Sequence, residues 1–191
     1  VPPRCPTCWM PSERPEAPCH RCRDRAFHLE ATRCPFVYEG AARAAVSALK
    51  YRGLSALAES MALPMAECLA EWSPPVAAIV PVPLAGQRRR LRGYNQSELL
   101  GRELSRLSGL PLASGALVRR RSTMPQARST DEAARRQNVA AAFALGPAAV
   151  EGAVLLVDDV LTSGATLDAC ARVLLDGGAG PVFALTFARE D

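Results

Sequence analysis

The segment VLLVDDVLTSGAT, at residues 154–166, carries more information about the fold than any other part of the chain. Four apolar residues lead directly into Asp158 and Asp159, and a turn of small and hydroxyl-bearing residues follows. A continuous apolar run is typical of a strand that is buried on both faces of a parallel sheet. The segment therefore predicts a strand at 154–157, a turn, and a helix at about 167–176.

Each part of this segment suits one part of a sugar phosphate. Exposed amide groups at a helix start, together with the hydroxyls of residues 162–166, bind phosphate, and Gly164 lets the backbone approach closely. The carboxylates of Asp158 and Asp159 can accept hydrogen bonds from vicinal ribose hydroxyls. The alternative, that the acids only begin a loop, is disfavoured because two acids after a buried strand are costly to bury unpaired. A Walker A loop is excluded because no Gly-Lys-Ser or Gly-Lys-Thr follows.

Strand-like and helix-like segments alternate along the rest of the chain. Further strands are expected at 36–38, 76–80, 116–119, 140–145 and 182–187, and further helices at 41–52, 54–72 and 95–108. Asn95 can cap the third of these helices, with Glu98 reaching back to it. The alternation predicts an α/β fold with a mostly parallel sheet that helices cover on both faces. The polar stretch at 120–138 is long for a connection, which is typical of a functional or mobile loop.

Four of the seven cysteines form two Cys-x-x-Cys pairs near the N-terminus, Cys5 with Cys8 and Cys19 with Cys22. Each pair aims two thiolates at one point, and two pairs complete the tetrahedral site that structural zinc prefers. The segment between the pairs has too few large apolar side chains to fold around a core, so a metal is its natural organiser. The pattern predicts one structural Zn²⁺ in a module at residues 1–33.

The alternatives for these cysteines are a disulfide pair or a redox motif, and neither suits two matched pairs in a cytoplasmic chain. His20 and Cys34 are less favoured as substitute ligands, because His20 lies inside a pair and Cys34 begins an apolar, strand-like run. Cys68 and Cys170 fall on apolar helical faces and are expected in the core.

The composition bounds the remaining possibilities. The 191 residues are 49% hydrophobic and 22% charged, with a net charge of +4, and no apolar run is long enough to span a bilayer. No signal peptide is visible, so a cytoplasmic protein without membrane insertion is expected. Lys50 is the exception among 23 basic residues, since all the others are arginine, which suits phosphate groups. The short arginine clusters do not predict a nucleic-acid surface, and 5% aromatic residues offer little area for base stacking.

Residues 158–166 resemble the loop with which type I phosphoribosyltransferases bind 5-phosphoribosyl-1-pyrophosphate (PRPP), with Ser163 where threonine is more usual. Several further stretches resemble the ComF family, whose members join a cysteine-rich zinc module to such a domain. These stretches are ALKYRG at 48–53, VPVPL at 80–84, RGYNQ at 92–96 and RRQNV at 135–139. The resemblance implies a zinc-binding module at 1–33 and a domain of type I phosphoribosyltransferase fold at 34–191.

The same resemblance implies that Asp158 and Asp159 contact the ribose hydroxyls of PRPP, and that Mg²⁺ bridges its pyrophosphate and ribose oxygens. The other implied PRPP-binding residues are Thr162, Ser163, Gly164, Ala165 and Thr166 for the 5-phosphate, and Val82, Pro83 and Leu84 for the pyrophosphate. Arg92 and Arg135 join the two acids as implied catalytic residues, with Arg135 in the stretch that closes over the site in this fold.

The function that the resemblance implies is transfer of the phosphoribosyl group from PRPP to an acceptor nitrogen, such as that of a nucleobase, with release of pyrophosphate. An association with DNA uptake in competent bacteria, or with nucleotide metabolism, is implied as well. Two alternatives stay open: a regulator that binds PRPP without turnover, and a protein that handles single-stranded nucleic acid together with DNA-uptake proteins. The sequence has no recognisable code for the acceptor and does not choose among the three.

Overall fold

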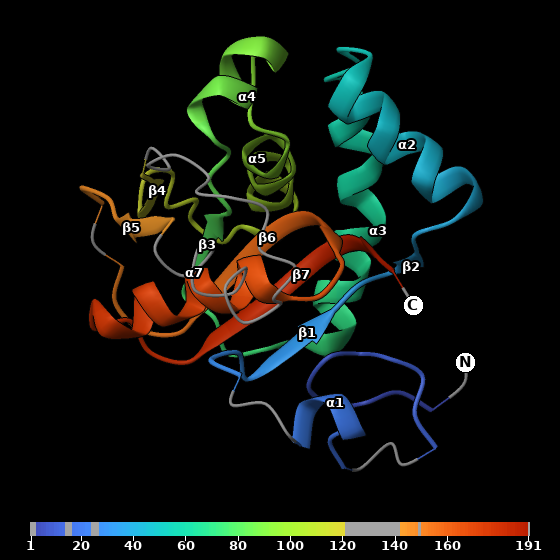
Figure 1. Cartoon of the computed structure of the whole chain (residues 1–191), viewed down its shortest axis with the longest axis vertical. Helices are drawn as coiled ribbons and strands as arrows, with labels where there is room; N and C mark the ends of the chain where they lie inside the picture. Colours follow the sequence, from blue (N-terminus) through green and yellow to red (C-terminus); the bar gives the residue numbers. More distant parts are fainter. Residues whose placement is uncertain (1–2, 14–16, 24–26, 121–141, 149, 191) are drawn as a thin grey trace, which may run out of the picture.

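A five-stranded parallel sheet forms the centre of the computed structural model, which describes residues 3–13, 17–23, 27–120, 142–148 and 150–190 (Figure 1). The strand order is β1 (Ala31–Arg33), β7 (Val182–Arg189), β6 (Val154–Leu161) and β3 (Ala78–Pro81), and β2 (Phe36–Val37) also pairs with β7. Every pairing in this sheet is parallel. The carboxyl ends of β3 and β6 therefore lie at the same edge of the sheet.

Helices cover both faces of the sheet, as the alternating pattern predicts. One face packs against α2 (Gly40–Tyr51), α3 (Leu57–Trp72) and α5 (Gln96–Ser108), and the other against α7 (Ala165–Asp176). Leu155 and Val157 belong to the first core, whereas Val154 and Leu156 belong to the second, because successive strand residues point to opposite faces. A separate antiparallel pair, β4 (Leu117–Arg119) and β5 (Phe143–Leu145), lies on the second side.

The strand that contains the acids is longer than its apolar run. β6 continues through Asp158 and Asp159 to Leu161, so the prediction of a strand ending at residue 157 was wrong. Pairing with β7 explains the extension, since Asp158 lies opposite Thr186 and Leu161 opposite Arg189. The two acids are therefore held by a hydrogen-bonded strand and not by a loop.

Three short elements were not predicted from the sequence. β1 has the sequence Ala-Thr-Arg, which lacks an apolar run, and it exists as a strand because it pairs with β7. The helix α4 (Gly86–Arg92) has no buried residue, so no apolar stripe indicated it. The helix α1 (His20–Arg23) is a single turn that carries the second cysteine pair.

The N-terminal cysteine-bearing segment packs against the β1 edge of the sheet. The Thr32 amide donates to the Thr7 carbonyl at 2.7 Å, and the Arg33 guanidinium donates to the Pro6 carbonyl at 2.9 Å. The Arg33 guanidinium also lies over two indole rings, 4.0 Å from the centre of Trp9 and 4.9 Å from that of Trp72. Within the described residues, no helix is long and apolar enough to cross a membrane.

Candidate functional site

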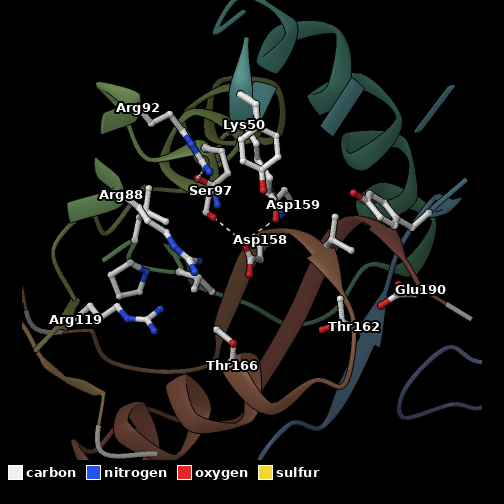
Figure 2. A pocket seen from close by; sticks show the side chains of 17 residues that line it. Lys50, Arg88, Arg92, Ser97, Arg119, Asp158, Asp159, Thr162, Thr166 and Glu190 are labelled. Atoms are coloured by element: carbon white, nitrogen blue, oxygen red, sulfur yellow. Dashed lines mark hydrogen bonds and ion pairs between the residues drawn. The ribbon is translucent and has the colours of Figure 1, made fainter. Parts of the chain in front are cut away.

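A cavity of about 320 Å³ opens at the carboxyl edge of the sheet, beside the ends of β3 and β6 (Figure 2). Ligands of open parallel sheets bind at this edge. The lining residues are Tyr38, Lys50, Tyr51, Val82, Pro83, Leu84, Arg88, Arg92, Gln96, Ser97, Arg119, Asp158, Asp159, Val160, Thr162, Thr166 and Glu190. The cavity thus gathers residues from separate parts of the chain around the two acids.

The two acids have different partners. Asp158 Oδ1 accepts a hydrogen bond from Ser97 Oγ at 2.7 Å and another from the Asp159 amide at 2.9 Å. Asp159 Oδ2 lies 2.8 Å from Lys50 Nζ, and the Asp159 side chain is only 4% exposed. One carboxyl group is therefore held by neutral donors and the other by a cation.

Burial, and then the charge of Asp159, raise the pKa of Asp158 to about 7, against the lowering effect of Ser97, the Asp159 amide and Lys50. Desolvation and a neighbouring like charge both disfavour the ionised carboxyl. The arrangement keeps a carboxyl group near its titration point at neutral pH, which is typical of functional sites.

Ser97 is positioned by the start of α5. Asn95 caps this helix as predicted, because its Oδ1 accepts from the Ser97 amide at 3.2 Å. The Asn95 Nδ2 donates to the Val82 carbonyl at 2.9 Å, which ties the loop after β3 to the same helix start. Glu98 does not complete the capping box and lies near the guanidinium groups of Arg89 and Arg102 instead.

The hydroxyl-rich turn leads from β6 into α7, which begins at Ala165. Thr162 and Thr166 line the cavity, whereas Ser163, Gly164 and Ala165 are not among its lining residues. Gly164 has the left-handed φ of +78° and occupies the N-cap of α7. Ser163 Oγ accepts from the Ala165 amide at 3.4 Å. The turn and the start of α7 therefore contribute two hydroxyl-bearing residues, Thr162 and Thr166, to the lining of the cavity.

Arginine side chains form one wall of the cavity. Arg88 and Arg92 come from α4 and Arg119 from β4, and in Figure 2 all three lie on the same side of the acids. The Arg92 guanidinium donates to Gln96 Oε1 and lies 5.7 Å from the Tyr51 ring centre. Burial and the charge of Arg88 lower the pKa of Arg119. An anionic ligand would relieve this repulsion between neighbouring cations.

The structure brings together most of the residues singled out in the sequence, including Asp158, Asp159, Arg92 and the loop at 82–84. Arg135 lies outside the described residues, as does most of the 120–138 stretch. Sequence reasoning did not predict that Lys50, Ser97, Arg88 and Arg119 line this cavity. The available signals were the single lysine of the chain and an arginine run just after the 80–84 motif.

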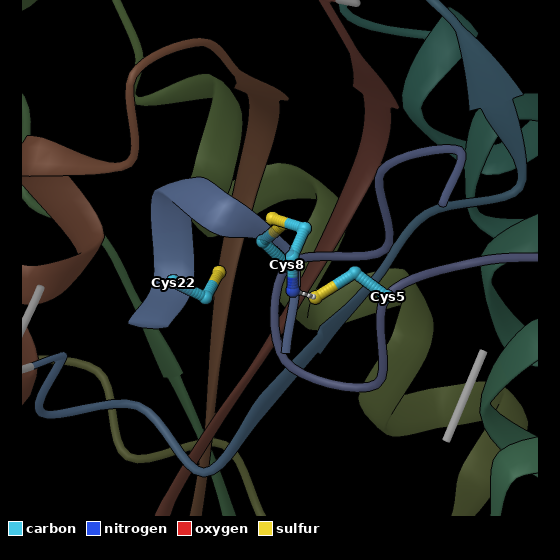
Figure 3. Close-up of side chains that lie close together, drawn as sticks. Cys5, Cys8 and Cys22 are labelled. Atoms are coloured by element: carbon cyan, nitrogen blue, oxygen red, sulfur yellow. Dashed lines mark hydrogen bonds between the residues drawn. The ribbon is translucent and has the colours of Figure 1, made fainter. Parts of the chain in front are cut away.

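The four N-terminal cysteines cluster at a separate site (Figure 3). The sulfur atoms of Cys5, Cys8, Cys19 and Cys22 lie within 4.8 Å of one another, and those of Cys8 and Cys19 are 3.7 Å apart. Zn–S bonds of about 2.3 Å in a tetrahedron put neighbouring sulfurs roughly 3.8 Å apart, so the cluster can hold a metal ion.

The backbone favours the thiolate form of Cys5, whereas burial raises the pKa of Cys8 and of Cys22. Burial raises the pKa of Cys5, but the amides of Cys8, Cys19 and Thr7 lower it to about 7. One of these contacts is a hydrogen bond from the Cys19 amide to Cys5 Sγ at 3.3 Å. Metal ligation requires thiolates, so these amides prepare Cys5 as a metal ligand.

The fold and the two sites define an α/β protein with a polar cavity and a separate four-cysteine cluster that can hold a metal ion. The chain is 33% identical over 184 residues to the DNA utilization protein YhgH of Salmonella typhi, an alignment that spans 93% of this chain and 80% of that protein. It is 29% identical over 196 residues to competence protein ComFC of Bacillus subtilis, and this alignment spans 97% of this chain and 78% of that protein. Competence protein F of Haemophilus influenzae is 41% identical over 100 residues, which are 51% of this chain and 43% of that protein. The chain belongs to the ComF family, as its motifs predicted.

No model of a protein family matches the chain. Among solved structures, an adenine phosphoribosyltransferase is 14% identical, with a TM-score of 0.44 over 76% of this chain and 75% of that one. The glutamine PRPP amidotransferase from B. subtilis, in complex with ADP and GMP, is 23% identical, with a TM-score of 0.43 over 66% of this chain and 26% of that one. The predicted architecture, a parallel sheet flanked by helices with a cysteine cluster at the N-terminus, is confirmed.

Proposed function

We propose that the protein binds PRPP in the cavity at the end of β6 and transfers its phosphoribosyl group to an acceptor nitrogen. The observation that supports this most is the convergence of three groups on one cavity: the acid pair, the hydroxyl-rich turn and the arginine wall. A ribose with a phosphate at one end and a pyrophosphate at the other requires these three kinds of partner.

The residues divide the ligand among them. Asp158 and Asp159 accept hydrogen bonds from the ribose hydroxyls, and the turn with Thr162 and Thr166 binds the 5-phosphate at the start of α7. Val82, Pro83 and Leu84, with the three arginines of the wall, receive the pyrophosphate. Arginine offers a fork of donors that matches phosphate oxygens.

In the transfer, the acceptor nitrogen forms a bond to C1 of the ribose while the bond from C1 to the pyrophosphate oxygen breaks, and the proton that the acceptor nitrogen loses passes to solvent. The arginines stabilise the charge that gathers on the departing pyrophosphate, and this charge is largest after the bond has lengthened. The catalytic role of Arg135 stays a prediction, because this residue lies outside the described part of the chain.

Mg²⁺ prefers oxygen ligands and keeps several waters, so the ligand itself would hold most of its coordination sphere. Asp158 fits this ion better than Asp159, because Asp159 is already paired with Lys50. When bound, Mg²⁺ would neutralise the pyrophosphate. Zn²⁺ in the four-cysteine cluster would be structural, since four thiolates leave no open coordination position.

The names of the relatives favour a link to DNA uptake or DNA utilization. We propose this link as the biological setting of the pocket. The cavity has a polar lining with two carboxylates in it, which suits a sugar phosphate better than a run of phosphodiesters.

Binding is tested by isothermal calorimetry with PRPP and Mg²⁺. The double variant Asp158→Asn, Asp159→Asn should bind PRPP at least about tenfold more weakly, because it loses charged acceptors for the ribose hydroxyls. Asp176→Asn is the matched control, since Asp176 is an exposed acid at the end of α7 and does not line this cavity. Unchanged affinity in the double variant would contradict the assignment of the acids.

Turnover is tested separately by incubating the protein with PRPP, Mg²⁺ and each nucleobase in turn, and measuring the release of pyrophosphate. Acceptor-dependent release establishes a transferase. PRPP binding without release for any acceptor would favour the alternative, a regulator that keeps the pocket but not the reaction.

A further inference from the structure

Lys50 is the only lysine in a chain with 23 basic residues. Everywhere else the sequence uses arginine, so a compositional preference does not explain a lysine at this position. An ammonium group is compact and donates in three directions, whereas a guanidinium is a planar fork. We therefore expect position 50 to require the compact charge of an ammonium group.

The Lys50 side chain reaches the cavity from the last turn of α2 and meets the buried acid. Its Nζ lies 2.8 Å from Asp159 Oδ2, with the two side chains 21% and 4% exposed (Figure 2). Within the part of the chain that the structure describes, Asp159 Oδ2 is buried and receives no hydrogen bond of ordinary geometry. The ammonium of Lys50 is therefore the counter-charge of Asp159.

The backbone that carries Lys50 is fixed in place. Leu49 is fully buried, and its carbonyl accepts a hydrogen bond from the Tyr94 hydroxyl. Tyr94 directly precedes Asn95, which caps α5 and holds the loop at Val82. The backbone beside Lys50 is thus linked through Tyr94 to the start of α5 and to the loop at Val82.

A sugar pyrophosphate would add several negative charges to a cavity that already contains Asp158 and Asp159. The arginine wall meets this charge on one side, and Lys50 is in direct contact with Asp159. Without a cation at this place, the acids and the bound anion would repel one another in a partly dehydrated cavity.

We propose that Lys50 is a positioning residue that also supplies charge: it fixes Asp159 toward the ribose hydroxyls, and its ammonium neutralises part of the bound pyrophosphate ester. This inference rests on the proposed binding of PRPP. It makes ligand binding less dependent on Mg²⁺, because the protein supplies part of the positive charge.

The experiment measures the PRPP affinity by calorimetry, in Mg²⁺ and again in a chelator, and takes the ratio of the two dissociation constants. Removing Lys50 alone leaves a buried unpaired carboxylate, which destabilises the fold. We therefore compare Asp159→Asn with the double variant Lys50→Met, Asp159→Asn, in which both charges are gone. Arg43→Met is the control, because Arg43 is an exposed cation on the same helix and does not line the cavity.

The dissociation constant in chelator, relative to that in Mg²⁺, should rise at least about tenfold more in the double variant than in Asp159→Asn. Arg43→Met should have the ratio of the wild type. Lys50→Arg keeps the charge, so its ratio should stay near that of the wild type, although the wider guanidinium should weaken binding in both conditions.

Equal ratios in Asp159→Asn and the double variant would overturn the claim that Lys50 supplies charge. The positioning role would be overturned if the single variant Lys50→Met folds and binds PRPP as tightly as the wild type does. Absence of PRPP binding by the wild type itself is a different result, since it rejects the proposed function and this inference with it.

Discussion

At the scale of single residues, Asp158 and Asp159 are neighbours on one strand with different hydrogen-bond and charge partners. Asp159 is paired with Lys50, whereas Asp158 accepts hydrogen bonds from Ser97 and a backbone amide. Burial and the neighbouring carboxylate raise the pKa of Asp158 to about 7. A folded-state pKa above the unfolded value means that the ionised form of Asp158 opposes folding.

This surrounding predicts a pH dependence of stability. Between about pH 4 and pH 7 the folded protein binds a proton that the unfolded chain releases, so the free energy of unfolding should fall as the pH rises through this window. Asp158→Asn keeps an oxygen for Ser97 and removes the charge. Its melting temperature should exceed that of the wild type at pH 8, by roughly 2–4 °C for each kcal/mol gained in the free energy of unfolding. This difference in melting temperature should shrink toward pH 4.

The measurement is calorimetric melting of both proteins without ligand from pH 4 to pH 8, and Asp176→Asn serves as control. A variant that is less stable than the wild type at pH 8 would show that Asp158 stabilises the fold. The expected combination, higher stability with weaker PRPP binding, is typical of a residue retained for function.

At the scale of elements, the junction of β6 and α7 depends on Gly164. Its φ of +78° lies in the left-handed region, where a residue with a β-branched side chain is strained. A Cβ at this position would lie 3.6 Å from Leu161 Cδ1 and from Phe27 Cε1, which is ordinary contact. The conformation of the backbone, more than lack of space, thus demands glycine.

Gly164→Val should lower the free energy of unfolding by roughly 1–2 kcal/mol and weaken PRPP binding at least about tenfold, because relaxing the strain moves the turn that holds the phosphate. Gly109→Val is a matched control. Gly109 ends α5 with a similar φ of +76° and open space around it, far along the helix from the cavity. Chemical denaturation and calorimetry separate the two effects. Equal loss of affinity in both variants would mean that strain acts only through global stability.

At the scale of the whole molecule, the cysteine cluster is joined to the sheet by contacts that reach toward the pocket. Arg189, at the end of β7, donates to the Cys8 carbonyl, and the next residue, Glu190, lines the cavity. Arg33 joins Trp9 of the N-terminal segment to Trp72 of α3. The cysteine cluster is therefore part of the packed structure at the sheet edge.

Purified protein should contain about one equivalent of zinc, the number that four thiolates hold. Cys19→Ser should lose this metal, and the tryptophan emission should shift to longer wavelength because Trp9 leaves its contact with Arg33. Cys68→Ser is the control, since Cys68 lies outside the cluster. Mass spectrometry of the native protein and fluorescence provide the readouts. Folded wild-type protein without metal under reducing conditions would contradict the structural zinc site.

Features that depend on neighbours along the chain could be predicted from the sequence alone. The apolar run before Asp158 predicted the buried strand, the glycine and hydroxyl residues after it predicted the turn, and the spacing of the cysteine pairs predicted their cluster. Asn95 likewise predicted the start of α5, because a cap acts on the two or three residues that follow it. Short-range patterns of this kind are readable because their partners are close in the chain.

The residues that complete the pocket from distant parts of the chain could be identified only in the folded structure. Ser97 meets Asp158 across 61 positions of sequence, and Lys50 meets Asp159 from a helix on another side of the cavity. The pairing of β7 decided that β6 continues through both acids, and the same strand turned the polar residues of β1 into part of the sheet. These contacts follow from how strands pair and helices pack, which a local pattern of polar and apolar residues does not encode.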